Sequence, residues 1–142
     1  MEEKDKVVIF LVEDNEGHAL LTKDLFRRAG IKNEVVHLKD GQEAWEHISG
    51  EARPAAACLM LLDLRLPRLD GFGLLRRIKA DAALKAMTVM ILTSSDDPKE
   101  MALCSELGCA AYLNKPLQFE KFTQAIDKQG LALVILDKHS AG

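Results

Sequence analysis

Short apolar runs alternate with amphipathic stretches along most of the chain, and this alternation restricts the fold more than any other feature of the sequence. The run VVIFLV at residues 7–12 is too short for a helix, so it predicts a buried strand. Four more strands are predicted at residues 34–38, 58–62, 88–92 and 110–113. Apolar residues at helical spacing predict helices at residues 19–29, 41–48, 72–80, 98–107 and 119–128. In the first of these the predicted apolar stripe is Ala19, Leu21, Leu25, Phe26 and Ala29.

Five strands that alternate with five helices indicate a parallel sheet, because parallel neighbours need a crossover connection that is usually a helix. Right-handed crossovers place helices on both faces of such a sheet. The sequence therefore predicts an α/β fold with a doubly wound five-stranded parallel sheet. We assign residues 7–129 to this domain, residues 1–6 to an N-terminal extension and residues 130–142 to an apolar C-terminal tail.

Polar residues stand where the predicted strands end. Glu13 and Asp14 follow the first strand, Asp63 follows the third, Thr93 follows the fourth and Lys115 follows the fifth. Because function in a doubly wound fold sits at the carboxyl ends of the strands, we expect these side chains to share one rim.

Three carboxylates at one rim repel each other. Two unit charges 4 Å apart cost about 4 kcal/mol at an effective dielectric constant of 20, and Lys115 can neutralise only one of the three. A solvated acidic loop end is one reading, but the lysine and hydroxyl at the same rim favour a divalent cation, Mg²⁺ or Mn²⁺. A carboxylate beside a cation, a lysine and a threonine can attack phosphorus and form an acyl phosphate. Asp63 is the best candidate, because a loop rather than a helix follows it, and Glu13 and Asp14 are better placed as metal ligands.

Four segments in this order resemble the receiver domain of two-component response regulators. They are VEDN, LLDLRLPRLDG, ILTSS and YLNKP, and the resemblance extends from residue 7 to about residue 129. It implies the flavodoxin-like receiver fold. The segment RIKADAALKAMTVMILTSS also resembles the single-domain subgroup that pairs with phytochrome-type sensor kinases.

The resemblance implies a phosphorylation site. Asp63 would accept a phosphoryl group from the phosphohistidine of a sensor histidine kinase. Glu13, Asp14, Asp63 and the backbone carbonyl of Arg65 would bind Mg²⁺. Lys115 would pair with the phosphoryl oxygens.

The resemblance also implies a switch. Thr93 would hydrogen-bond the phosphoryl group, and Tyr112 would turn inward as Thr93 moves. The bond before Pro116 would be cis. Arg65 is a long cationic side chain where many members have a smaller or neutral one. We expect it to contact the phosphoryl group or Glu13, or to block attacking water, and so to alter the lifetime of the phosphorylated state.

These features predict a single-domain response regulator that switches protein–protein interactions and is not an enzyme beyond its own phosphorylation and dephosphorylation. Only 13 residues follow Gln129, so we expect no DNA-binding module. The protein would bind a partner, relay the phosphoryl group to a histidine phosphotransfer protein or drain it from a kinase. One alternative is a pseudo-receiver that is never phosphorylated. Another is an aspartyl-phosphate phosphatase, although such enzymes usually carry a second Asp where this chain has Arg65.

The C-terminal tail contains the apolar run LALVIL at residues 131–136. An exposed run of this kind favours association, so we expect a homodimer in which the tail packs on, or exchanges with, the partner. The alternative is that the tail extends the last helix or folds back on its own domain.

Composition excludes other classes. The net charge of −3, from 19 basic and 22 acidic residues, argues against nucleic acid as a partner. No apolar run approaches membrane-spanning length, and MEEKDK is not a signal peptide. The odd count of three cysteines predicts reduced thiols. We therefore expect a soluble cytoplasmic protein with no membrane contact.

Other polar residues near the motifs have structural interpretations. Asp70 and Gly71 are expected to form a turn into a helix, and His18 is expected to be solvated near the rim. Trp45 is expected in the core or on a helix surface, while His37 and His47 show no partner spacing.

Overall fold

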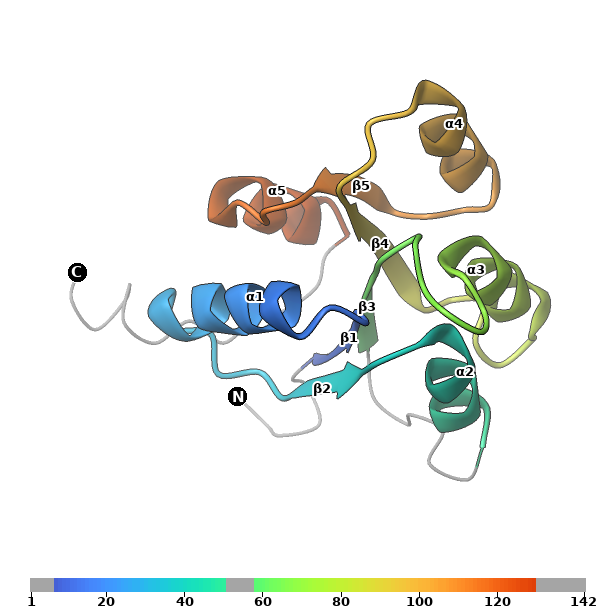
Figure 1. Cartoon of the computed structure of the whole chain (residues 1–142), viewed down its shortest axis with the longest axis horizontal. Helices are drawn as coiled ribbons and strands as arrows, with labels where there is room; N and C mark the ends of the chain where they lie inside the picture. The colour runs from blue at the N-terminus through green and yellow to red at the C-terminus, as the bar shows by residue number, and fades with distance from the viewer. Residues whose placement is uncertain (1–6, 51–57, 130–142) are drawn as a thin grey trace.

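The computed structural model describes residues 7–50 and 58–129, which form five parallel strands flanked by helices (Figure 1). The order of the strands is β2-β1-β3-β4-β5, and every neighbouring pair is parallel. This confirms the predicted doubly wound α/β fold. The tail at residues 130–142, with its expected dimer contact, lies outside the described residues. The elements are β1 (Val8–Val12), α1 (Glu16–Arg28), β2 (Val35–Leu38), α2 (Gly41–Ser49), β3 (Cys58–Leu62), α3 (Gly71–Ala80), β4 (Thr88–Thr93), α4 (Pro98–Glu106), β5 (Ala111–Asn114) and α5 (Phe119–Gln129).

Helices cover both faces of the sheet, which explains why the central strands are apolar on both sides. Figure 1 shows α1 and α5 on one side, and α2 and α3 on the other. Strand β3 supplies both cores, because Met60 and Leu62 point to the face of α2 and α3, while Leu59 and Leu61 point to the face of α1 and α5. All four are 0% exposed. The sheet therefore fixes the ends of its strands rigidly. Within the described residues, no helix is long and apolar enough to span a membrane.

Helix α1 differs from its prediction. It begins at Glu16, three residues before the first apolar residue of the predicted pattern, because Asn15 caps it by accepting a hydrogen bond from the His18 N–H at 3.0 Å. Its buried stripe is Ala19, Thr22 and Phe26. The expectation that Leu21 lies on that stripe is wrong, since Leu21 is 60% exposed and lies off that face.

Asp70 caps α3 by accepting from the Gly73 N–H at 2.8 Å, which confirms the predicted turn. Trp45 is half-buried against the core, beneath the Arg77 guanidinium carbon at 5.7 Å from its ring centre. His47 packs edge-on to Phe10, with ring centres 5.6 Å apart. These residues support the face of the sheet that α2 and α3 cover.

Gly41 lies where α2 meets the loop before α3, and we expect Gly41→Ala to destabilise the fold by more than about 2 kcal/mol. A Cβ atom there would lie 1.7 Å from the Leu69 carbonyl oxygen, so backbone would have to move. Urea unfolding measures the effect. The matched control is Gly17→Ala, whose Cβ would meet only the Asn15 side chain at 3.3 Å. We expect it to change stability by less than about 1 kcal/mol, and equal costs would contradict the prediction.

Candidate functional site

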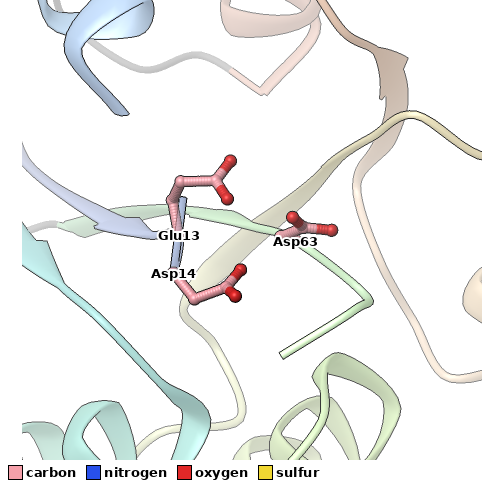
Figure 2. Close-up of side chains that lie close together, drawn as sticks. All are labelled: Glu13, Asp14 and Asp63. Atoms are coloured by element: carbon pink, nitrogen blue, oxygen red, sulfur yellow. The ribbon is translucent and has the colours of Figure 1, made fainter. Parts of the chain in front are cut away.

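The three acidic residues predicted at the rim lie together. Glu13 and Asp14 follow β1, Asp63 follows the neighbouring β3, and one carboxylate oxygen from each lies within 4.8 Å of the others (Figure 2). Glu13 is 2% exposed and Asp63 is 6% exposed, whereas Asp14 is open to solvent. The cluster therefore has two buried carboxylates and one that faces water.

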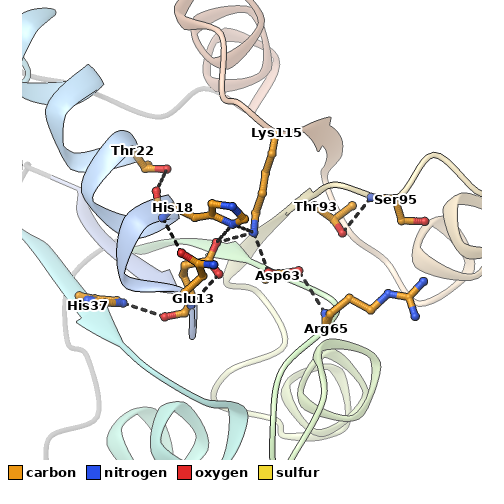
Figure 3. Close-up of polar contacts among 10 residues, drawn as sticks. Glu13, His18, Thr22, His37, Asp63, Arg65, Thr93, Ser95 and Lys115 are labelled. Atoms are coloured by element: carbon orange, nitrogen blue, oxygen red, sulfur yellow. Dashed lines mark hydrogen bonds and ion pairs between the residues drawn. The ribbon is translucent and has the colours of Figure 1, made fainter.

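Lys115 lies between the two buried carboxylates (Figure 3). Its Nζ is 2.5 Å from Glu13 Oε1 and 2.7 Å from Asp63 Oδ2. It enters from the end of β5, and the Lys115–Pro116 bond is cis, as predicted. One lysine charge against three carboxylates leaves a formal charge of −2. Hard oxygen donors with that charge suit a divalent cation.

Burial and pairing shift the ionisation of this group in defined directions. Burial raises the pKa of Glu13, and the hydrogen bonds from Lys115 and the Asn15 N–H offset this only in part. Burial alone would lower the pKa of Lys115, but the hydrogen bonds and charges of Asp63 and Glu13 outweigh it and raise the pKa. Lys115 is therefore held in its charged form beside Asp63.

We expect Glu13→Gln to stabilise the metal-free protein at neutral pH. A carboxyl whose pKa is raised on folding stabilises the fold below its unfolded pKa, and that contribution is lost as pH rises through the folded pKa. Gln mimics the protonated form at every pH. The advantage of the variant should therefore shrink as pH falls towards 4.5, the ordinary Glu value. Urea unfolding in EDTA at several pH values measures it, and a difference that does not change with pH would contradict it.

The predicted switch residues both contact the loop after β4. Thr93 is 1% exposed, and its Oγ1 accepts a hydrogen bond from the Ser95 N–H at 3.3 Å. The Tyr112 hydroxyl donates to the Ser95 carbonyl at 2.9 Å, and Asn114 Nδ2 donates to the same oxygen at 3.1 Å. Thr93 and Tyr112 are thus joined through one residue, so a displacement of the loop at Ser95 reaches both.

Arg65 makes a contact that sequence reasoning missed. Its backbone N–H donates to Asp63 Oδ1 at 3.1 Å, while its guanidinium pairs with Glu100 Oε2 on α4 at 2.9 Å. The side chain therefore turns towards α4, and not towards Glu13, which was one of its expected contacts. Nothing in the sequence points to Glu100, because the pair depends on how α4 is oriented.

Two histidines make contacts that their predictions did not include. His18 is exposed at the rim, as expected, with 45% of its side chain open to solvent, but its Nδ1 also lies 3.1 Å from Lys115 Nζ and 3.9 Å from Glu13 Oε1. His37, which showed no partner spacing, has Nε2 2.8 Å from the backbone oxygen of Glu13. Both histidines therefore support the segment that carries the acidic pair.

The rim opens into a hollow of about 470 Å³ whose lining includes all three carboxylates, Thr93 and Lys115. A second hollow of about 390 Å³ lies between α1 and the segment after β5, lined by His18, Leu21, Leu25, Lys115 and Leu117 among others. The first has room for a hydrated cation and a phosphoryl group beside Asp63.

The sequence matches the family described as response regulator receiver domain over residues 9–127. The chain belongs to this family. This receiver domain is 32% identical over 138 residues to the response regulator Rcp1 of Synechocystis sp., a match that covers 91% of this chain and 92% of Rcp1. Receiver proteins act in two-component signalling, in agreement with the resemblance seen in the sequence motifs.

Solved receiver structures share the fold. The bacteriophytochrome response regulator AtBRR has a TM-score of 0.78 and 34% identity, covering 93% of this chain and 98% of that one. A Mn²⁺-bound form of Rcp1 has a TM-score of 0.74 and 33% identity, covering 92% and 98%. The phosphorylated cyanobacterial phytochrome response regulator RcpA has a TM-score of 0.73 and 30% identity, covering 90% and 98%. The similarity to phytochrome-associated response regulators implies a sensor kinase as partner.

Proposed function

We propose that this receiver domain accepts a phosphoryl group on Asp63 from a sensor histidine kinase in a Mg²⁺-dependent reaction, and thereby switches protein–protein interactions. The observation that carries the proposal is the position of Asp63, buried beside two further carboxylates and 2.7 Å from the Lys115 ammonium. The Mn²⁺-bound form of Rcp1 and the phosphorylated form of RcpA support it.

Glu13, Asp14 and Asp63 would hold Mg²⁺, together with the backbone carbonyl of Arg65. When bound, the cation would neutralise charge on the phosphoryl oxygens. An Asp63 oxygen would attack phosphorus, forming an O–P bond as the P–N bond to the donor histidine breaks and its electron pair returns to the imidazole. Lys115 would pair with the phosphoryl oxygens, and burial of Asp63 would limit the access of water.

The switch would begin at Thr93. Its hydroxyl would turn from the Ser95 N–H to a phosphoryl oxygen, and the loop contact of Tyr112 would change with it. A shift from 1:99 to 99:1 needs about 5.5 kcal/mol. Two or three charge-assisted hydrogen bonds, each worth about 1.5–3 kcal/mol, are enough to supply it.

We also infer a cytoplasmic protein whose kinase is of the phytochrome type, with a histidine phosphotransfer protein as a further acceptor of the phosphoryl group.

We also propose a homodimer through residues 131–136. Sedimentation of a chain truncated after Gln129 tests the dimer, since an unchanged oligomeric state would eliminate a role for the tail.

Intact mass spectrometry after incubation with acetyl phosphate tests the proposed function. We expect one phosphoryl adduct that requires Mg²⁺, disappears with EDTA and is absent in Asp63→Ala. No adduct, either from acetyl phosphate or from a phosphorylated kinase, would favour the pseudo-receiver alternative. The phosphatase alternative is disfavoured because the position two residues after Asp63 holds Arg65, paired with Glu100, instead of an acid.

A further inference from the structure

The Lys115 ammonium has three protons and three close acceptors within the described residues. Two are the carboxylate oxygens of Glu13 and Asp63, and the third is His18 Nδ1 at 3.1 Å. Figure 3 shows the His18 ring beside the end of the lysine chain. An imidazole nitrogen that accepts a hydrogen bond carries no proton itself, so a hydrogen bond from Lys115 to Nδ1 places the ring proton of His18 on Nε2.

The start of α1 places His18 there. Asn15 accepts from the His18 N–H at 3.0 Å, and its own N–H donates to Glu13 Oε2 at 3.1 Å. One residue therefore fixes both Glu13 and His18. Helical side chains lean towards the N-terminus of their helix, so His18 in the first turn of α1 leans back over the end of β1. The same ring and the Lys115 side chain line both the acidic hollow and the apolar one beside α1.

We propose that His18 is a positioning residue for Lys115 in the phosphorylation reaction. This inference rests on the proposed function. The two carboxylates that pair with Lys115 each have another role in that function, Asp63 as the phosphoryl acceptor and Glu13 as a cation ligand. His18 has neither role, so its hydrogen bond can keep the Lys115 ammonium in place.

A neutral acceptor suits this role better than a third carboxylate would. It orients the ammonium through a hydrogen bond and leaves the full positive charge of Lys115 for the phosphoryl oxygens. The first turn of α1 thus becomes part of the reaction centre through Lys115, 97 residues along the chain.

The test compares His18→Asn with His18→Leu. Asn can place an acceptor oxygen close to the position of His18 Nδ1, whereas Leu has nearly the same shape as Asn but no acceptor atom. Acetyl phosphate is used as the donor, because a small donor needs no docking on α1 and isolates the chemistry. We expect His18→Leu to slow phosphorylation about fivefold and His18→Asn to stay within about twofold of the wild type.

Long-range ¹H–¹⁵N correlation of the histidine rings gives a second readout, with the His18 signals assigned by their loss in His18→Asn. We expect the Nε2–H tautomer. The Nδ1–H tautomer would overturn the proposal, and so would equal phosphorylation rates for the two variants and the wild type. A wild type that forms no adduct, either from acetyl phosphate or from a phosphorylated kinase, would overturn the proposed function, and with it this role of His18. The two failures are therefore distinguishable.

Discussion

Lys115→Met is expected to destabilise the metal-free protein by about 3 kcal/mol and to slow phosphorylation at least about 100-fold. The Lys115 side chain is 12% exposed, and the side chains of Glu13 and Asp63 on either side of it are 3% and 7% exposed. Methionine fills similar space but leaves Glu13 and Asp63 without their shared cation. The free energy of unfolding in EDTA and the rate of adduct formation with acetyl phosphate measure the two effects.

Mg²⁺ should separate the two consequences of this substitution. A divalent cation replaces the missing positive charge, and the site of the variant carries a formal −3 in place of −2. The gain in stability on adding Mg²⁺ should therefore be larger in Lys115→Met than in the wild type, while phosphorylation stays slow. Lys39→Met is the control, because its pair with Glu16 joins side chains that are 65% and 70% exposed. An equal effect of the two substitutions, or a Lys115→Met variant that is phosphorylated normally, would contradict the prediction.

The fold could be predicted because the strands are nearly continuous apolar runs, and because the connecting helices show apolar residues at helical spacing. Burial on both faces of a parallel sheet leaves this trace in sequence. The start of α1 was less accessible, because the capping residue Asn15 decides it and the apolar period does not. Leu21 illustrates the limit of periodicity, since its apolar character did not place it in the core.

The acidic part of the site could be predicted for a topological reason. Glu13, Asp14 and Asp63 end strands that are neighbours in the sheet, so the chain direction alone brings them together. The contacts made by longer side chains could not be predicted in this way. His18 reaches Lys115, and Arg65 reaches Glu100 across 35 residues, only because of the rotamers and helix orientations that the packed core sets.

Asp14→Asn is expected to weaken Mg²⁺ binding at least about tenfold, equivalent to about 1.4 kcal/mol. Asp14 is the carboxylate of the cluster that faces solvent, and Lys115 pairs with the other two. Its loss reduces the formal charge of the site from −2 to −1. Unit charges about 4 Å apart interact by about 4 kcal/mol at a dielectric constant of 20, and exposure to water reduces this. Titration calorimetry with Mg²⁺ measures the affinity.

The Mg²⁺ concentration that gives half-maximal phosphorylation of Asp14→Asn should rise by the same factor, whereas its rate at saturating Mg²⁺ should fall much less than that of Lys115→Met. The matched control is Asp96→Asn, which makes the same chemical change at an exposed residue lining the same hollow but outside the carboxylate cluster. We expect the control to alter Mg²⁺ affinity by less than about twofold, because exposed charges beyond the immediate site are largely screened. If both substitutions weakened binding equally, the cation would respond to the general negative potential of the hollow. If only Asp14→Asn does so, the carboxylates at the ends of β1 and β3 are its ligands.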